Sequence, residues 1–565
     1  MKCLKYLLAA AFIVCCGMRA IAQSDYINIG NKQYQLLDRL DIRLQNDSLL
    51  GFTTVKPYDR RKITESVLRI DSLDKAGALP FHLTPTDRYN IQRLLMDNWE
   101  WAGAYADSFR IKPLFHTFYQ TPANLYAVNT KDFKLVITPL LNLQYGYAND
   151  GTGSIFQNTR GISIRGNIAG RLGFYTILTD NQERDPAYVR DFVNKYDAVP
   201  GAGFYKLYNK NGYDYFDARG GISFNAAKYF DIQFAYDKLF IGNGFRSLLL
   251  SDFSSNYLYL RISTRIWKFD YENIFAQTIA PFPPYGLDGK RDMRPRNYMM
   301  MHHLSLQVSR WLNIGFYENI MEDGKNGLQL SYLNPVIFYR SVEQQLGAAG
   351  KANIGLDFKA NIARSVQLYG QLLINEFVTR EVLHYRRGNF ANKQGLQVGV
   401  KYVDAFHVKN LDLQAEANFV RPFTYTNYDS TTNFTHYNQP LAHPLGANFR
   451  EFIGMARYQP ARKVHLTGKL LYHQQGLDSA GVNMGSNVFR SYNSRPRDYG
   501  FYIGSGIPAT GMMAALGASW EIFENMFIDL NATYRRYSVQ DQPHTNTFFY
   551  TAGIRMNLQP RAFNF

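Results

Sequence analysis

Two runs decide the fold of this chain: FDIQFAYD at residues 230–237 and LYLRISTRI at residues 258–266. Apolar and polar residues alternate along both, so each run predicts a strand with one apolar and one polar face. Between them lie Gly242 and Gly244, which can adopt the positive φ angles that a tight connection needs. We therefore predict an antiparallel hairpin joined by a Gly-rich tight turn.

The same period of two returns along most of the chain after about Lys131. The clearest run is LDLQAEANF at residues 411–419. Similar runs lie at residues 133–147, 162–168, 304–308, 354–362, 526–534 and 548–558. The chain ends on aromatic residues, Phe563 and Phe565, as barrels recognised by the outer-membrane insertion machinery typically do, although Pro560 interrupts the last strand.

Composition indicates that these strands cross a membrane. Aromatic residues make up 15% of the chain, with 41 Tyr and 40 Phe, while the mean hydropathy is −0.30. After the first 22 residues no apolar run reaches the roughly 20 residues that a spanning helix needs. In a spanning barrel only alternate residues face lipid, and closure leaves no unpaired sheet edge in hydrocarbon. We predict an all-β fold, a transmembrane antiparallel β-barrel of about 16 to 18 strands.

The N-terminus predicts export. Lys2 and Lys5 precede an apolar centre at residues 7–14 and a small-x-small cleavage site at residues 20–22, so residues 1–22 are expected to be a signal peptide. The alternative is a lipoprotein signal that uses Cys15 or Cys16. With Cys3, these are the chain's three cysteines, so the mature protein would contain neither a disulfide nor a cysteine metal site.

Residues 23–125 show helical spacing instead. Apolar residues recur at helical intervals over 34–44, 63–70 and 91–99, and Thr84 and Pro85 provide an N-cap and a first-turn proline. Each of the three expected helices has a single apolar stripe, so they should pack on one another or across a barrel mouth. We predict a periplasmic helical segment at 23–125 and the barrel at 126–565.

Charge and loops suggest the kind of partner. The formal charge is +16, and removing Lys2, Lys5 and Arg19 with the signal peptide leaves +13. A basic exported chain favours anionic exopolysaccharide or lipopolysaccharide, beside outer-membrane lipid, over nucleic acid. Four long polar connections are candidate extracellular loops, whereas short turns should face the periplasm. These connections lie at residues 180–212, 281–297, 425–448 and 476–508.

Three longer motifs carry a family resemblance. They are FIGNGFRSLLLSD at 240–252, RPFTY at 421–425 and HYNQPLAHPLGAN at 436–448. Together with a helical segment before a large barrel, they resemble outer-membrane proteins of the gliding-motility RemB type of Bacteroidota, which are similar to the capsule-assembly Wzi family. The resemblance implies a cell-surface barrel in the outer membrane that anchors polysaccharide without catalysis or cofactors. It equally allows a gliding-motility or adhesion component that works through envelope proteins, and a diffusion porin is a third alternative.

Seven residues in these motifs are candidates for polysaccharide binding. Arg246 and Asp252 follow the glycines, where they either bind a ligand or hold the loop in place. The others combine hydrogen-bond donors with flat rings, which suits sugar recognition. They are Arg421, His436, Tyr437, His443 and Asn448. The alternative for this group is a self-packed loop bent at its two prolines.

Catalysis and metal binding have little support in the sequence. His302 and His303 are adjacent, so on a strand they would point to opposite faces, and no carboxylate is spaced to complete a metal site. No nucleophile elbow or Walker-type phosphate loop is present. We expect no enzyme activity, no metal and no cofactor.

Overall fold

The structure, a computed structural model, describes residues 24–45, 50, 52–209, 211–282, 294–336, 338–346, 352–376, 381, 385–479 and 481–565. The predicted signal peptide at 1–22 lies outside the described residues. Within them, no helix is both long and apolar enough to span a membrane.

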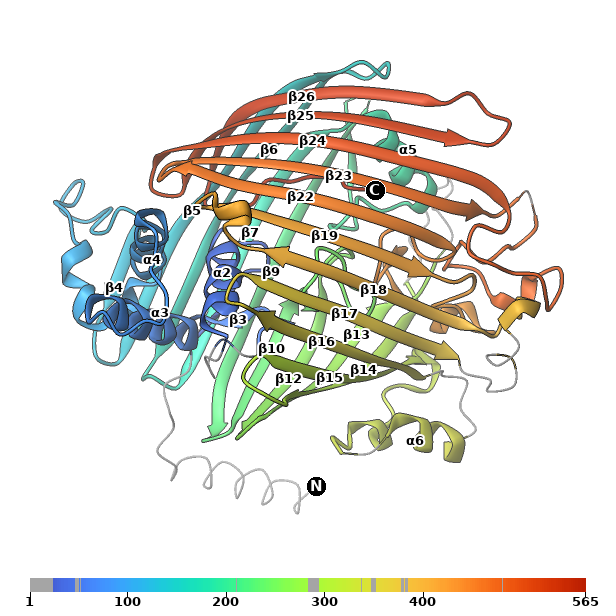
Figure 1. The fold of residues 1–565 in the computed structure, drawn as a ribbon, viewed down its shortest axis with the longest axis horizontal. Helices are drawn as coiled ribbons and strands as arrows, with labels where there is room; N and C mark the ends of the chain where they lie inside the picture. Colours follow the sequence, from blue (N-terminus) through green and yellow to red (C-terminus); the bar gives the residue numbers. More distant parts are fainter. Residues whose placement is uncertain are drawn as a thin grey trace.

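A closed antiparallel barrel forms most of the described chain, with 18 strands in its ring (Figure 1). The strands are β5 (Phe133–Ala148), β6 (Gly153–Ile168), β7 (Leu172–Arg184), β9 (Gly212–Ala227), β10 (Phe230–Asp237), β12 (Tyr257–Ile266), β13 (Phe269–Ile279), β14 (Arg296–Gln307), β15 (Leu312–Asp323), β16 (Ala352–Ile362), β17 (Val366–Glu376), β18 (Lys393–Tyr402), β19 (Leu411–Val420), β22 (Phe449–Ala461), β23 (Val464–Leu477), β24 (Ile507–Phe523), β25 (Met526–Val539) and β26 (Thr545–Met556). β26 pairs with β5 and closes the ring, and the short strands β4 (Tyr126–Asn129) and β8 (Lys206–Tyr208) extend it. The predicted fold class and strand number are confirmed.

The barrel wall, meaning these ring strands, is apolar outside. In β10 the side chains of Phe234 and Tyr236 are 47% and 48% exposed, whereas Asp231 and Gln233 are buried on the inner face. A water-soluble sheet protein would show the opposite order, because its apolar face packs inward. The alternation that the sequence shows therefore separates a lipid-facing surface from a buried interior.

Three helices occupy one end of the barrel, at the left of Figure 1. They are α2 (Gln33–Leu44), α3 (Arg60–Lys75) and α4 (Pro85–Asp97), with the short strands β1 (Tyr26–Ile27), β2 (Val55–Lys56) and β3 (Tyr58–Asp59). Asp59 caps α3, and Thr84 and Asp87 form the capping box of α4. The helices share an apolar core that includes Leu40 and Val67. We call α2–α4 with β1–β3 the helical plug.

The two ends of the barrel differ in their connections. At the end with the helical plug, neighbouring strands are joined by short turns such as 169–171 and 228–229, and we call it the short-turn end. At the long-loop end lie most of the remaining elements. They are α5 (Ala187–Tyr196), η4 (Gly324–Asn326), η5 (Leu330–Leu333), α6 (Tyr339–Leu346), η6 (Tyr385–Arg387), η8 (Ser430–Thr432), β20 (Thr435–His436), β21 (Gln439–Pro440) and η9 (Tyr492–Ser494). The short strand β11 (Phe240–Ile241) reaches into the barrel and pairs with β2 of the helical plug. The helices η1 (Trp99–Trp101), η2 (Gly103–Tyr105), η3 (Asp107–Phe109) and η7 (Ala405–His407) lie at the short-turn end.

The connection between β10 and β12 corrects one prediction. The two strands pair as expected, but residues 238–256 between them form a long buried loop and not a tight turn. A Cβ on Gly244 would lie only 2.4 Å from Glu416 Oε2, so this glycine permits close contact with the wall. Leu249 and its two leucine neighbours are fully buried there. The predicted turn was wrong because alternation says nothing about where a connection packs.

The C-terminal tail also lies inside the barrel. β26 ends at Met556, and the tail runs back along the interior until Arg561 binds Glu183 at 2.7 Å and Tyr188 Oη donates to the carbonyl of Phe563 at 2.8 Å. Phe565 then packs edge-on against Tyr188. The terminal aromatic residues therefore belong to the interior packing and not to the last strand.

Candidate functional site

The helical plug is fixed to the wall by buried ion pairs. Arg39 contacts the carboxylates of Asp404, at 3.0 Å, and Asp412. Lys359 Nζ lies 2.8 Å from Asp41 Oδ2. Paired charges of this kind are costly to break, because either partner left alone would be a buried, unpaired ion.

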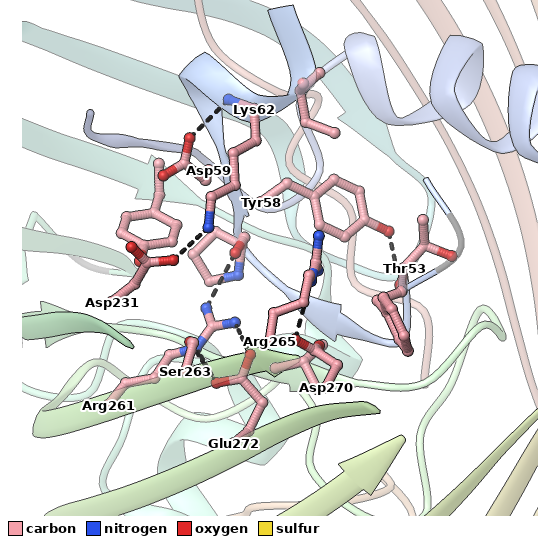
Figure 2. A pocket seen from close by; sticks show the side chains of 15 residues that line it. Thr53, Tyr58, Asp59, Lys62, Asp231, Arg261, Ser263, Arg265, Asp270 and Glu272 are labelled. Atoms are coloured by element: carbon pink, nitrogen blue, oxygen red, sulfur yellow. Dashed lines mark hydrogen bonds and ion pairs between the residues drawn. The ribbon is translucent and has the colours of Figure 1, made fainter. Parts of the chain in front are cut away.

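Figure 2 shows one stretch of this contact, a cavity of about 50 Å³ between β3, α3 and strands β10, β12 and β13. Arg261 binds Glu272 at 2.7 Å, and Lys62 reaches across from α3 to Asp231. The space suffices for one or two water molecules and not for a sugar. The charges around this cavity are paired with one another, so they hold the plug and the wall together.

Two connections fill the other part of the lumen. Residues 238–256 and 421–448, which we call the loop plug, pack on inward-facing residues of the wall such as Met301 and Tyr317. Tyr317 Oη donates to the carbonyl of Leu249 at 3.0 Å. The part of the lumen that the loop plug fills is therefore apolar, although the alternation along the strands predicts a polar interior.

Arg246 and His443, two candidate site residues, meet at a carboxylate that the sequence analysis did not single out. Arg246 Nη2 lies 3.1 Å from Glu451 Oε1, and His443 Nε2 lies 2.6 Å from Glu451 Oε2. Burial lowers the pKa of His443, so the neutral ring donates from Nε2 to Glu451. The backbone N–H groups of Phe245 and Arg246 donate to Glu416. Both glutamates lie on the polar face of their strands, which is the only sequence signal for them.

Arg421 and Asn448 hold neighbouring loops. Arg421 donates from Nε to the carbonyl of Asn392 at 2.6 Å and from Nη2 to that of Phe501 at 3.2 Å. Asn448 Nδ2 donates to the carbonyl of Ser505 at 2.7 Å. These bonds connect the loop plug to the connections β17–β18 and β23–β24.

His436 and Tyr437 are buried in the same region. Burial lowers the pKa of His436 to about 4, which leaves the ring neutral at pH 7. Its Nδ1 accepts from the N–H of Ile279 at 3.0 Å, and its Nε2 lies 3.0 Å from the carbonyl of Asn256. Tyr437 packs against Phe282.

Asp252 alone among the seven candidates has an exposed side chain. The other six are buried or half-buried and bond to other parts of the chain. This geometry favours the loop-holding alternative, and a ligand-binding role for the seven residues stays a prediction.

The histidine pair has separate partners. His303 Nε2 lies 2.7 Å from Asp357 Oδ2, and His302 Nε2 lies 2.6 Å from Tyr339 Oη. Across the described ranges, no group of three or more His, Cys, Asp or Glu side chains is arranged to hold a metal ion.

An exposed basic and aromatic surface lies at the long-loop end. We call it the loop-rim surface, and it consists of Arg386, Arg387, Arg497, Tyr499 and Tyr502. Gly500 N–H donates to the carbonyl of Arg387 at 2.9 Å, and Tyr502 Oη donates to that of Arg386 at 2.5 Å. The connections β17–β18 and β23–β24 are thus bonded side by side.

The charges of this surface are available to a ligand. The rings of Tyr499 and Tyr502 are 45% and 47% exposed. Among the described residues, no carboxylate forms an ion pair with Arg386, Arg387 or Arg497. Residues 497–502 lie in one of the predicted long polar loops, whereas Arg386 and Arg387 were not predicted. Their only sequence signal is that two arginines stand together between two alternating runs.

Comparison with known proteins supports the fold. No protein-family model and no curated protein matches the chain. Among solved structures, Wzi from Escherichia coli, a carbohydrate-binding barrel involved in group 1 capsule assembly, is similar with a TM-score of 0.51 and 12% identity, over 96% of this chain and 100% of that one. OprD and OccK1 (OpdK) of Pseudomonas aeruginosa match with TM-scores of 0.40 and 0.42 and 9% identity each, over 76% and 75% of this chain and 96% and 98% of theirs.

The closed barrel, its apolar outer face and the likeness to Wzi establish an outer-membrane β-barrel with a Wzi-like fold. At this identity the likeness concerns the fold alone. The resemblance to RemB-type proteins of Bacteroidota stays a prediction.

Proposed function

We propose that this protein binds anionic polysaccharide at the cell surface, without catalysis, through the loop-rim surface. The observation that carries the proposal is the presence of three exposed arginines without a carboxylate partner beside two exposed tyrosines. Guanidinium groups bind carboxylates in a bidentate manner, and tyrosine rings stack on the apolar faces of sugars. Acidic sugar units offer both features.

The orientation of the barrel supports this proposal. Outer-membrane barrels carry short turns on the periplasmic side and longer loops outside. With that arrangement, the helical plug faces the periplasm and the loop-rim surface faces the medium. The solved Wzi barrel, which has a similar fold, is described as carbohydrate-binding.

The lumen favours attachment over transport. The helical plug and the loop plug both lie within the barrel and are bonded to its wall. A diffusion pore needs a continuous water-filled path, so this packing favours a binding role for the surface.

Binding is tested with the purified barrel in detergent and immobilised polygalacturonate, with neutral dextran as the control ligand. The variant Arg386→Ala/Arg387→Ala/Arg497→Ala should weaken polygalacturonate binding by about tenfold or more, because each lost charged contact contributes about 1 kcal/mol. Arg69→Ala/Arg88→Ala/Arg171→Ala removes equal charge from exposed positions at the short-turn end and should leave binding unchanged. Equal losses in both variants would show non-specific attraction and contradict the proposal.

A cellular assay tests the role. Cells that carry the loop-rim variant should release surface polysaccharide into the medium, while the control variant retains it. If neither the variant nor a gene deletion changes the amount of cell-associated polysaccharide, the protein does not act in its attachment.

A further inference from the structure

A short hairpin at the short-turn end exposes apolar residues to solvent. It spans residues 110–120, RIKPLFHTFYQ, between η3 and β4. Leu114 N–H donates to the carbonyl of Phe118 at 2.7 Å, and Ile111 N–H donates to that of Gln120 at 2.9 Å. These bonds give the hairpin a defined backbone conformation, and its tip is formed by Phe115 and His116.

The tip adopts a backbone conformation that suits neither residue. Phe115 has φ 48° and His116 has φ 60°, both in the left-handed region. Hairpins usually place Asn or Gly at such positions, and a bulky residue there costs roughly 1 kcal/mol or more. The hairpin thus keeps a strained phenylalanine at its tip, with 79% of its surface exposed.

The other apolar side chains of the hairpin are also uncovered. Ile111, Leu114 and Phe118 are 48%, 53% and 40% exposed. Lys112 and Arg110, both exposed, are close to them in sequence. A patch that combines aromatic, aliphatic and basic side chains matches the boundary between phospholipid headgroups and acyl chains.

The position of the hairpin supports a lipid partner. Tyr119 N–H donates to the carbonyl of Leu125 at 2.8 Å, and β4 joins the wall from residue 126 onward. On the neighbouring strands at this end, Phe133 and Ile168 are 38% and 45% exposed on the lipid-facing side. The segment between η3 and β4 extends beyond the wall at the left of Figure 1 and leads into β4, which pairs with β5, the strand that begins at Phe133.

From these observations we infer that the hairpin 110–120 inserts Phe115 and its apolar neighbours into the phospholipid leaflet at the short-turn end. The hairpin then anchors the segment that links the helical plug to the first wall strands. Its basic residues contact the headgroup phosphates. This inference concerns the opposite end of the molecule from the loop-rim surface and does not depend on polysaccharide binding.

Spin labelling tests the insertion in the full chain. The described residues contain no cysteine, so with Cys3, Cys15 and Cys16 changed to Ser, one label can be placed at Phe115→Cys. Leu516→Cys on the lipid-facing wall, where the side chain is 70% exposed, is the lipid reference. Glu65→Cys on α3, with its side chain 48% exposed, is the aqueous reference.

Each labelled barrel is reconstituted into vesicles of phosphatidylethanolamine and phosphatidylglycerol. The collision rates with oxygen, which concentrates in lipid, and with a water-soluble nickel chelate are then measured. We expect the oxygen-to-nickel ratio at residue 115 to lie within about twofold of that at residue 516 and at least about fivefold above that at residue 65. An unchanged heat-induced gel shift confirms folding.

Three results would overturn the inference. A ratio at residue 115 equal to that at residue 65 places the tip in water. Exclusion of both reagents, with dipolar broadening between labels, places it against a second copy of the chain. Phe115→Trp provides an independent arm that avoids labelling: brominated phospholipids should quench its additional emission, and the absence of such quenching also contradicts insertion.

Discussion

The helical plug and the loop plug fill the same lumen in different ways. The helical plug has an apolar core of its own, with Leu40, Val67 and Leu95 buried among its helices. It meets the wall through ion pairs and meets the loop plug where its strand β2 pairs with β11. The loop plug has no separate core, because Leu249 packs directly on wall residues such as Tyr317. The first packs around its own apolar cluster inside the barrel, whereas the second is part of the barrel's own core. The two should therefore respond differently to substitution.

The largest effect is expected from Glu451→Ala, because it leaves Arg246 and His443 buried without their carboxylate. We expect a loss of about 3 to 5 kcal/mol in the free energy of unfolding of the whole barrel. Urea titration in detergent micelles, followed by the strand signal in circular dichroism, measures it. Glu451→Gln removes the charge but keeps a hydrogen-bond acceptor, so it should lose less than Glu451→Ala; no loss in Glu451→Gln would mean that the charge is unimportant there.

Acid should weaken the loop plug through His436. The folded pKa is about 4, below the ordinary 6.5, so stability is fully present above pH 6.5 and falls as the pH drops from 6.5 towards 4. The slope approaches about 1.4 kcal/mol per pH unit. As the pH falls, the free energy of unfolding should therefore decrease more in the wild type than in His436→Asn. Urea titration at pH 7.5, 5.5 and 4.5 measures both. His407→Asn, at an exposed position, should keep the full pH dependence; if it does not, the assignment to His436 is wrong.

Lys359→Ala should affect the helical plug alone. The substitution leaves Asp41 buried without its lysine and should cost about 2 to 3 kcal/mol of docking free energy. Hydrogen exchange should become faster in α2 while the wall strands keep their protection. Simultaneous loss of protection in β16 and β17 would show that the two plugs do not differ as described.

The smallest expected effect is on ion conductance. In planar bilayers both the wild type and Lys359→Ala should pass little or no current, because the loop plug remains in place when the helical plug loosens. Current in Lys359→Ala alone would show that the helical plug provides the seal. Steady current in the wild type would instead favour the porin alternative.

The barrel was predictable because its wall obeys local rules. Alternation along 411–419 and 526–534 reports which side chains face lipid, and the capping pattern at Thr84 reports where α4 begins. The site was less accessible to sequence reasoning. Arg246, His443 and Asn448 have side chains of the kinds that bind sugars, yet each contacts other residues of the chain inside the lumen.

What the sequence determined by itself was a closed outer-membrane barrel with helices before it, since the period of a strand or helix is set by neighbouring residues. Only the tertiary structure decided that residues 238–256 fill the lumen, that the tail ending at Phe565 turns inward, and that Arg387 and Tyr502 share one surface. These positions depend on partners distant in the sequence, and a local pattern of polarity carries no information about which distant residue will supply the contact.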